Sequence, residues 1–161
     1  MLKSKYVNGK MSIRNQIIKE GDVNAFKNDL VVGEDFEDRT VANLNDDSHN
    51  YLKIEGYFTA FDLICDKTYN TIECKTDLIA GRTGNFFFEI DGLLKKSEAK
   101  QLYYEIDDKV YVFNFKKLRD YLRQLHRDGV EPVAGGDGKG VKGMLLPIDL
   151  LRSMWHIEYY E

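Results

Sequence analysis

Hydrophobic and polar residues alternate along this chain with two different periods, and these periods predict where helices and strands lie. Apolar residues three or four apart predict helices, whereas alternation and short β-branched or aromatic runs predict strands. The spacing predicts helices over residues 34–44 and 114–127, a helical turn over 97–101 and a last short helix that opens at Pro147. It predicts a hairpin over 57–76 and strands over 51–57, 86–90, 102–106, 109–113 and 142–146.

This order of elements predicts an α/β (α+β) fold with a central mixed β-sheet flanked by helices. The length of 161 residues fits a single domain with a real core. Within 1–161, residues 1–32 form an irregular or helical lead-in and 33–127 the core. Residues 128–161 contribute a glycine-rich loop, a strand and a C-terminal helix. The acidic run 34–38 is expected in the first turn of its helix, where the helix dipole favours negative charge.

The hairpin over 57–76 separates its side chains onto two faces. If residues 67–70 form the turn, Asp66 lies opposite Thr71 and Asp62 lies opposite Lys75. One face is then wholly apolar and carries Phe61, Leu63, Cys65, Ile72 and Cys74. The other face is mostly polar and carries Asp62, Ile64, Asp66, Thr71, Glu73 and Lys75.

Asp62 and Glu73 are close neighbours on the polar face. Two carboxylates about 4 Å apart repel each other by roughly 1 to 4 kcal/mol, depending on the local dielectric. A lysine relieves part of this repulsion, and a divalent cation with oxygen ligands relieves more. Such a cation beside an ammonium group can hydrolyse a phosphodiester. The alternative is a half-exposed hairpin whose polar face is simply solvated.

Asp62, ten intervening residues and then Glu73-Cys74-Lys75 resemble the D…(D/E)-x-K signature of the PD-(D/E)XK, or restriction-endonuclease-like, nuclease superfamily. The context resembles that family too, because both parts lie on adjacent predicted strands after an acid-bearing helix. Residues 83–90 look like the segment that follows the motif in small phage-borne nucleases. The resemblance covers residues 33–125, and Phe61 stands where the family usually has proline.

The resemblance implies a restriction-endonuclease-like core and a role for each matching residue. Asp62 and Glu73 would bind Mg²⁺ (or Mn²⁺), with the carbonyl of Cys74 as a further ligand and Lys75 as the catalytic lysine. The family often adds an acid from the preceding helix. Glu37 is the candidate because it shares a helical stripe with Val41 and Leu44, and Glu34 is the alternative.

The expected function is that of a magnesium-dependent deoxyribonuclease, a phosphodiester hydrolase that binds DNA. Arg82 and Asn85, just beyond the catalytic strand, are the candidates for contact with a backbone phosphate. Cutting both strands would favour a homodimer. One alternative is a catalytically inactive protein of the same fold that binds nucleic acid or protein, and another is an unrelated α/β interaction domain.

Charge and composition modify this picture only slightly. The net charge is −4, but residues 20–66 hold twelve acidic and three basic residues (net −9), and 94–127 hold nine basic and five acidic residues (net +4). This asymmetry suits a cation site and a phosphate site, although solvated faces would produce it too. The basic stripe of the second long helix (Lys116, Arg119, Arg123 and Arg127) is interpreted as a solvated face.

Cys65 and Cys74 are the only cysteines, and they are expected to be free thiols. Together with three scattered histidines they do not form a zinc motif. No apolar stretch approaches the roughly 20 residues of a membrane span. No signal peptide is evident at the N-terminus. A cytoplasmic protein without membrane contact is therefore expected.

Overall fold

The computed structural model of the protein describes residues 20–55, 60–135, 140–154 and 158–160. The helical elements are α2 (Glu20–Leu44), α3 (Ala80–Thr83), the π-helical turn η1 (Ile90–Leu94), α4 (Phe115–Arg127) and α5 (Ile148–Met154). The strands are β1 (Tyr51–Lys53), β2 (Leu63–Cys65), β3 (Thr71–Asp77), β4 (Asn85–Glu89), β5 (Gln101–Ile106), β6 (Lys109–Asn114), β7 (Val133–Ala134), β8 (Lys142–Pro147) and β9 (Glu158–Tyr160). Most of the predicted lead-in, residues 1–19, lies outside the described residues.

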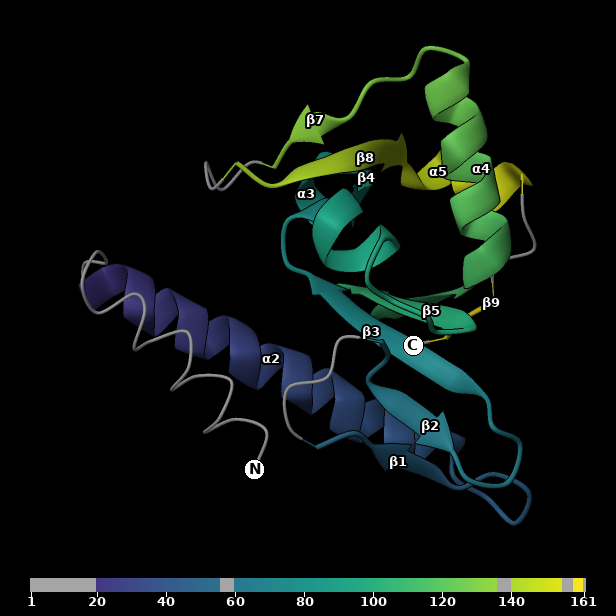
Figure 1. Ribbon diagram of the computed structural model, residues 1–161. Helices are drawn as coiled ribbons and strands as arrows, with labels where there is room; N and C mark the ends of the chain where they lie inside the picture. The colour runs from purple at the N-terminus through teal and green to yellow at the C-terminus, as the bar shows by residue number, and fades with distance from the viewer. Residues whose placement is uncertain (1–19, 56–59, 136–139, 155–157, 161) are drawn as a thin grey trace.

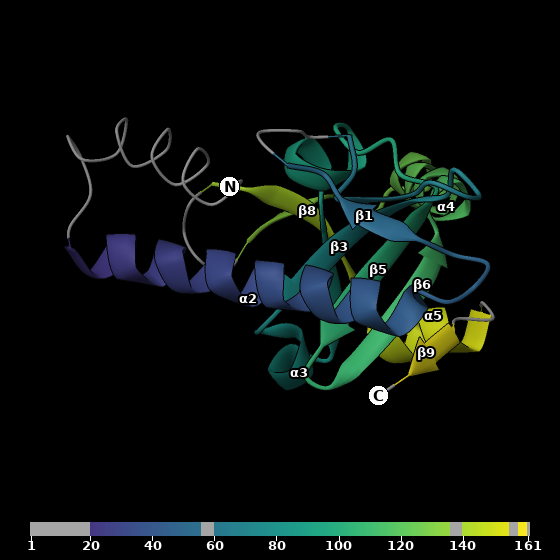
Figure 2. The ribbon, with the colours of Figure 1, turned by 90° about the horizontal axis from the view of Figure 1, so that it is seen from below.

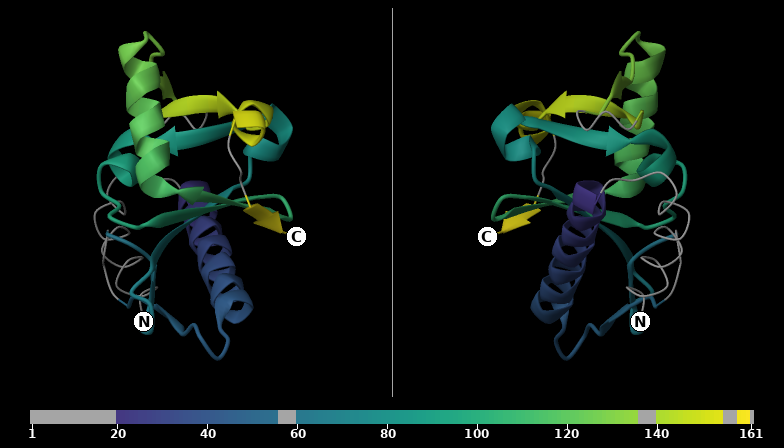
Figure 3. Two further views of the ribbon diagram at one scale, coloured as in Figure 1. Left: turned by 90° about the vertical axis from the view of Figure 1, so that its right-hand side faces the viewer. Right: turned by 90° about the vertical axis from the view of Figure 1, so that its left-hand side faces the viewer.

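Two sheets organise the described part of the chain. The larger has six strands in the order β1-β2-β3-β5-β6-β9, and the smaller has three in the order β4-β8-β7. The β3–β5 pair is parallel and the other pairs are antiparallel, so the larger sheet is mixed. Helix α2 crosses one face of this sheet, and the smaller sheet with α4 and α5 lies on the other side (Figures 1, 2 and 3). The prediction of an α+β fold with a central mixed sheet flanked by helices is confirmed.

Apolar side chains fill both faces of the larger sheet. Between the two sheets, Phe86 meets Tyr104, Tyr111 and Phe113 edge-to-face at centroid distances of 5.1, 5.1 and 5.3 Å. Beneath α2 a second cluster contains Phe36, Tyr51, Leu63, Cys65, Ile72, Tyr103 and Val110. Both faces of the larger sheet are therefore covered, and no residue of β2 or β3 is fully exposed.

A salt bridge between α2 and β5 joins the helix to the sheet. Arg39 donates from both terminal nitrogens to the two carboxylate oxygens of Glu105, at 2.6 and 3.0 Å. Its Nε donates to Asp35 at 2.8 Å, and its guanidinium lies 5.5 Å from the Phe36 ring centroid. Glu105 is only 6% exposed, so Arg39 supplies most of the compensation for a buried charge.

Helix α2 is longer than predicted, since it begins at Glu20 instead of residue 34. The acidic run 34–38 therefore lies inside the helix, and the expectation that it occupies the first turn is wrong. Residues 20–33 contain no proline, and Gly33 within a helix costs only about 1 kcal/mol. Nothing in the local sequence stops the helix before Leu44.

Within β2 and β3 the residues keep their predicted faces, but the register of the hairpin differs by two residues. Leu63 pairs with Ile72 and Ile64 with Thr71, and the Cys65 N–H donates to the Asn70 carbonyl at 2.9 Å. The prediction that Asp62 lies opposite Lys75 is therefore wrong. A shift of two residues preserves the faces because side chains alternate with a period of two. The alternation of apolar and polar residues thus cannot distinguish the two registers.

Two further local predictions are wrong. Phe61 precedes β2, where strand alternation no longer applies, and it packs into the cluster between the sheets instead of beneath α2 with Leu63. No helical turn forms over 97–101, because backbone N–H groups there donate to distant partners: Glu98 to Ala60 and Lys100 to Thr71. The first strand is confirmed over Tyr51–Lys53, and residues 56–59, where the predicted strand ends and the predicted hairpin begins, lie outside the described residues.

The remaining predicted elements agree with the structure to within a residue or two. The late helix α4 begins at Phe115 because Asn114 caps it, accepting from the Lys117 N–H at 3.1 Å. Strands β7 and β9 were not predicted; both are short. Within the described ranges, no helix combines the length and the apolar character that crossing a bilayer requires.

Candidate active site

Asp62 lies immediately before the first residue of β2, beside β3. Its backbone N–H donates to the Ile72 carbonyl at 3.0 Å, and its carbonyl accepts from the Ile54 N–H at 2.9 Å. Its carboxylate accepts from the Cys74 N–H at 2.8 Å, which replaces a strand hydrogen bond that β2 no longer supplies. Burial raises the pKa of Asp62 to about 6, against the opposing effects of that hydrogen bond and of Lys53.

Glu73 lies on the neighbouring strand β3 and faces the same region. Burial raises its pKa to about 8, and the negative charges of Asp62 and Glu37 raise it further against a hydrogen bond from Ser97. The Ser97 hydroxyl lies 2.9 Å from Glu73 Oε2. Glu73 therefore shares a poorly solvated environment with a second carboxylate.

Glu37 reaches the same region from α2, where Val41 and Leu44 of its stripe pack into the cluster beneath the helix. Burial, followed by the charge of Asp62, raises the pKa of Glu37 to about 7. Lys53 Nζ lies 3.4 Å from Glu37 Oε2 and offsets part of this effect. Three carboxylates from α2, the start of β2 and β3 thus act on one another electrostatically.

The chemistry of these donors fits a hard divalent cation, which prefers several carboxylate oxygens and carbonyls. One carboxylate oxygen of Asp62 is bound by Cys74, one of Glu73 by Ser97 and one of Glu37 by Lys53. The second oxygen of each carboxylate accepts no hydrogen bond from the described residues. In a β-strand the N–H and the carbonyl of one residue point to the same side. Because the Cys74 N–H donates to Asp62, the Cys74 carbonyl also lies on the Asp62 side of β3. As the side chains stand, however, no group of three acidic, histidine or cysteine residues in the described ranges is arranged to hold a metal.

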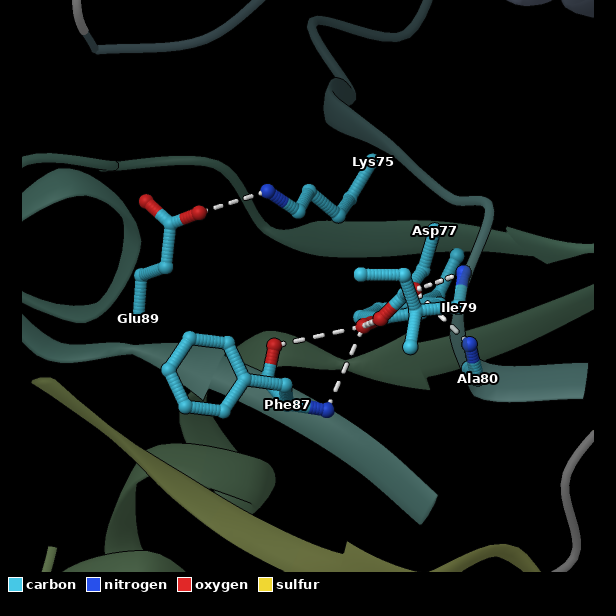
Figure 4. A network of polar contacts seen from close by, with 7 residues as sticks. Lys75, Asp77, Ile79, Ala80, Phe87 and Glu89 are labelled. Atoms are coloured by element: carbon cyan, nitrogen blue, oxygen red, sulfur yellow. Dashed lines mark hydrogen bonds and ion pairs between the residues drawn. The ribbon is translucent and has the colours of Figure 1, made fainter. Parts of the chain in front are cut away.

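Lys75, two residues after Glu73 on β3, is engaged by an acidic side chain. Its Nζ lies 2.7 Å from Glu89 Oε1, and both side chains are 28% exposed (Figure 4). Close by, the Tyr104 hydroxyl donates to Asp77 Oδ2 at 2.6 Å and contacts the backbone of Phe87. Asp77 Oδ1 accepts from the N–H groups of Ile79 and Ala80. These contacts join the end of β3 to β4, the two strands that carry Lys75 and Glu89.

A cavity of about 800 Å³ adjoins the Lys75–Glu89 pair. Its walls come from α2, the end of β3, α3, β4, β7 and β8, and they are largely apolar. Asn85, a predicted phosphate contact, lines this cavity, whereas the exposed Arg82 on α3 does not. The structure thus brings Asp62, Glu73 and Glu37 together, with Lys75 and Asn85 on the adjoining side, and leaves Arg82 at the surface.

Three residues of this region were not predicted from the sequence. Lys53, Glu89 and Ser97 contact Glu37, Lys75 and Glu73, respectively. Each of the three is separated from its partner in the sequence by at least one secondary-structure element or turn. The spacing of apolar and polar residues therefore does not predict the contact. The only sequence signal was the charge of Glu89 at the end of the apolar run 86–90.

In metal-free buffer, the free energy of unfolding is expected to fall as the pH rises from about 5 to about 9. The three carboxyls have folded pKa values of about 6, 7 and 8, whereas in the unfolded chain such groups titrate near pH 4. The folded state therefore binds more protons in this window, and stability is lost as the pH passes through the folded pKa values. Urea denaturation with EDTA at several pH values measures the decline.

Glu37→Gln removes one of the three charges and should flatten this pH dependence. Glu98→Gln, an exposed acid in the same region, should leave it unchanged. A stability that stays level or rises over this pH range would show that the three carboxyls do not share a desolvated site.

No protein-family model, no curated protein and no solved structure matches this chain. The function is therefore inferred from three features of the site: the three carboxylates, the Lys75–Glu89 pair and the adjoining cavity.

Proposed function

We propose that this protein is a metal-dependent DNA nuclease that hydrolyses phosphodiester bonds with Mg²⁺ or Mn²⁺. The observation that carries the proposal is the meeting of Glu37, Asp62 and Glu73 in a poorly solvated region, where the charge of Asp62 raises the pKa of both glutamates and that of Glu37 raises the pKa of Glu73. Carboxyl groups perturbed in this way are typical of functional sites, and a bound cation relieves their repulsion. Lys75 places an ammonium on the same strand.

Each residue has a distinct role in this proposal. Asp62, Glu73 and the carbonyl of Cys74 would hold the cation, and Glu37 would supply a further acidic group. Lys75 would orient the nucleophile and stabilise negative charge on the phosphate, once a substrate phosphate draws its ammonium from Glu89. The cation, when bound, polarises the phosphate and lowers the pKa of water.

DNA would approach from the side of Lys75 and Asn85. Arg82 and Asn85 would contact backbone phosphates, which position a substrate without reading its sequence. A homodimer would place two such sites on opposite strands of a duplex. Sedimentation of the protein with and without DNA measures that assembly.

The decisive experiment incubates the purified protein with linear, circular and four-way-junction DNA in Mg²⁺, Mn²⁺ or EDTA. Cleavage in either metal and none in EDTA is expected. Calorimetric titration with Mn²⁺ alone should show binding near the three carboxylates that is lost in Asp62→Ala. A protein that neither binds Mn²⁺ nor cuts any of these substrates would contradict the proposal.

Lys75→Ala is expected to lose cleavage by a factor of about 10² to 10³ and to retain most of its affinity for Mn²⁺. An ammonium stabilises charge in the transition state but is not a metal ligand. Calorimetry and a cleavage assay on the same preparation separate the two effects, with Lys95→Ala, which alters an exposed ion pair, as the control. Loss of Mn²⁺ binding in Lys75→Ala would mean that the lysine supports the fold of the site instead.

A second candidate function is a catalytically inactive protein of this kind that binds nucleic acid or protein. Two observations favour it: Lys75 is already neutralised by Glu89, and no three ligands in the described ranges are arranged to hold a metal. Binding of DNA without cleavage, unchanged by EDTA, would support this candidate over the nuclease.

A further inference from the structure

The turn from Leu94 to Glu98 touches both carboxylate-bearing segments of the candidate site. The Ser97 hydroxyl lies 2.9 Å from Glu73 Oε2 and 3.1 Å from the Ala60 carbonyl. The Glu98 N–H donates to the same Ala60 carbonyl at 2.6 Å. Because Ala60 lies two residues before Asp62, one short turn connects the segment that carries Asp62 to the side chain of Glu73.

Ser97 is placed to act on Glu73 more than on Ala60. It is 5% exposed, so water does not compete strongly for its hydroxyl. A hydroxyl carries one proton and can donate only one strong hydrogen bond at a time. The Ala60 carbonyl already accepts from the Glu98 N–H, whereas the Glu73 oxygen, once the carboxyl is ionised, gains most from the hydroxyl proton.

Arg119 of α4 holds this turn in place. Its Nε donates to the Leu94 carbonyl at 3.2 Å, and its terminal nitrogen donates to the Ser97 carbonyl. Its guanidinium lies 3.8 Å from the centroid of the Phe115 ring, which fixes its plane. The interpretation of the α4 basic stripe as a solvated face is therefore wrong for Arg119, which is directed into the protein.

We infer that Ser97, held by Arg119, is a positioning residue that sets the orientation of the Glu73 carboxylate relative to Asp62. The inference rests on the proposed function, because the orientation matters only if the two carboxylates share a cation. By engaging Oε2, Ser97 limits the rotation of the carboxylate and leaves Oε1 as the available ligand atom. Hydrogen bonds of this kind to a metal-binding carboxylate commonly change metal affinity by 10- to 100-fold.

The test measures Mn²⁺ affinity by calorimetry in the wild type, in Ser97→Ala and in Ser153→Ala, where Ser153 is an exposed serine that bonds within its own helix. We expect Ser97→Ala to bind Mn²⁺ about tenfold more weakly and Ser153→Ala to match the wild type. Cleavage by Ser97→Ala should recover at saturating Mn²⁺. A residue that merely supports the fold would lower the melting temperature without this split between metal dependence and maximal rate.

Arg119→Lys provides an independent variant that keeps the positive charge. A lysine cannot reach the Leu94 and Ser97 carbonyls together in the geometry of a guanidinium. Arg119→Lys is therefore expected to weaken Mn²⁺ binding in the same direction as Ser97→Ala. Arg123→Lys, one turn along the helix in an exposed pair with Asp120, is its matched control and should have no effect.

The possible results separate this inference from the proposed function. Mn²⁺ binding by the wild type with unchanged affinity in Ser97→Ala and Arg119→Lys overturns the inference and leaves the nuclease proposal intact. Weakening in Ser97→Ala alone overturns the role of Arg119. A wild type that binds no Mn²⁺ overturns both.

Discussion

Replacing Glu73 by glutamine is expected to reduce DNA cleavage by a factor on the order of 10³ and, at the same time, to stabilise the metal-free protein. The amide cannot serve as a charged ligand, so the proposed site loses one of its two principal metal-binding groups. In the absence of metal, however, the same change removes one of three carboxylates that repel one another. The pKa of Glu73 is raised from 4.5 to about 8, and one pKa unit corresponds to about 1.4 kcal/mol. After the cost of burying the amide, the gain in stability at pH 8 should therefore be at least about 2 kcal/mol.

Cleavage assays in Mn²⁺ and urea denaturation in EDTA measure the two effects on one preparation. Glu98→Gln is the matched control, because Glu98 is an exposed acid next to Ser97 and should change neither quantity. Wild-type cleavage by Glu73→Gln would remove Glu73 from the active site. A destabilised Glu73→Gln would instead mean that the carboxylate supports the fold.

Removal of Arg39 is expected to destabilise the protein by about 1 to 3 kcal/mol, because Glu105 is buried while the Arg39 side chain is 47% exposed. Arg39→Ala would leave Glu105, which is 6% exposed, as a buried negative charge without its bidentate partner. The same variant would remove the salt bridge that joins β5 to α2, the helix that carries Glu37. Urea denaturation measures the loss, and Arg123→Ala, which removes only an exposed pair, should stay within about 0.5 kcal/mol of the wild type.

The double variant Arg39→Leu/Glu105→Leu tests the cause of this loss. It removes both charges and should recover most of the stability, since a buried ion pair replaced by apolar groups is often neutral. If Arg39→Ala were destabilised by less than about 1 kcal/mol, Glu105 would be solvated or paired in another way. If the double variant were no more stable than Arg39→Ala, the packing of Arg39 over Phe36 would be the larger contribution.

The local patterns of the chain predicted most elements and the faces of the hairpin. The apolar residues Leu63, Cys65 and Ile72 lie beneath α2 as alternation requires. The register was two residues off because the turn uses residues 66–69, with Tyr69 at a positive φ of 58° that the sequence does not announce. Helix α2 was cut short because apolar spacing before residue 34 is loose, although nothing there breaks a helix.

The candidate site was predictable only where its members lie close together in the sequence or share a helical stripe. Asp62, Glu73 and Lys75 belong to one hairpin, and Glu37 belongs to the stripe with Val41 and Leu44. Ser97, Glu89 and Lys53 reach the site through tertiary packing, and no local period encodes such contacts. The internal role of Arg119 was hidden for the same reason, since its partners are carbonyls of a turn on another segment.

The pairing of β4 with β8 also determines when the site can assemble on a growing chain. The hairpin that carries Asp62 and Glu73 closes through local contacts and can form soon after it is synthesised. Strand β4, which carries Glu89 and leads into the Ser97 turn, finds its hydrogen-bonding partner only in β8, with α4 in between. A nascent chain would therefore bear the carboxylates first, and β4 with Glu89, the partner of Lys75, would join its sheet only after residues 142–147 have left the ribosome. The proposed activity would thus be withheld until strand β8 has emerged.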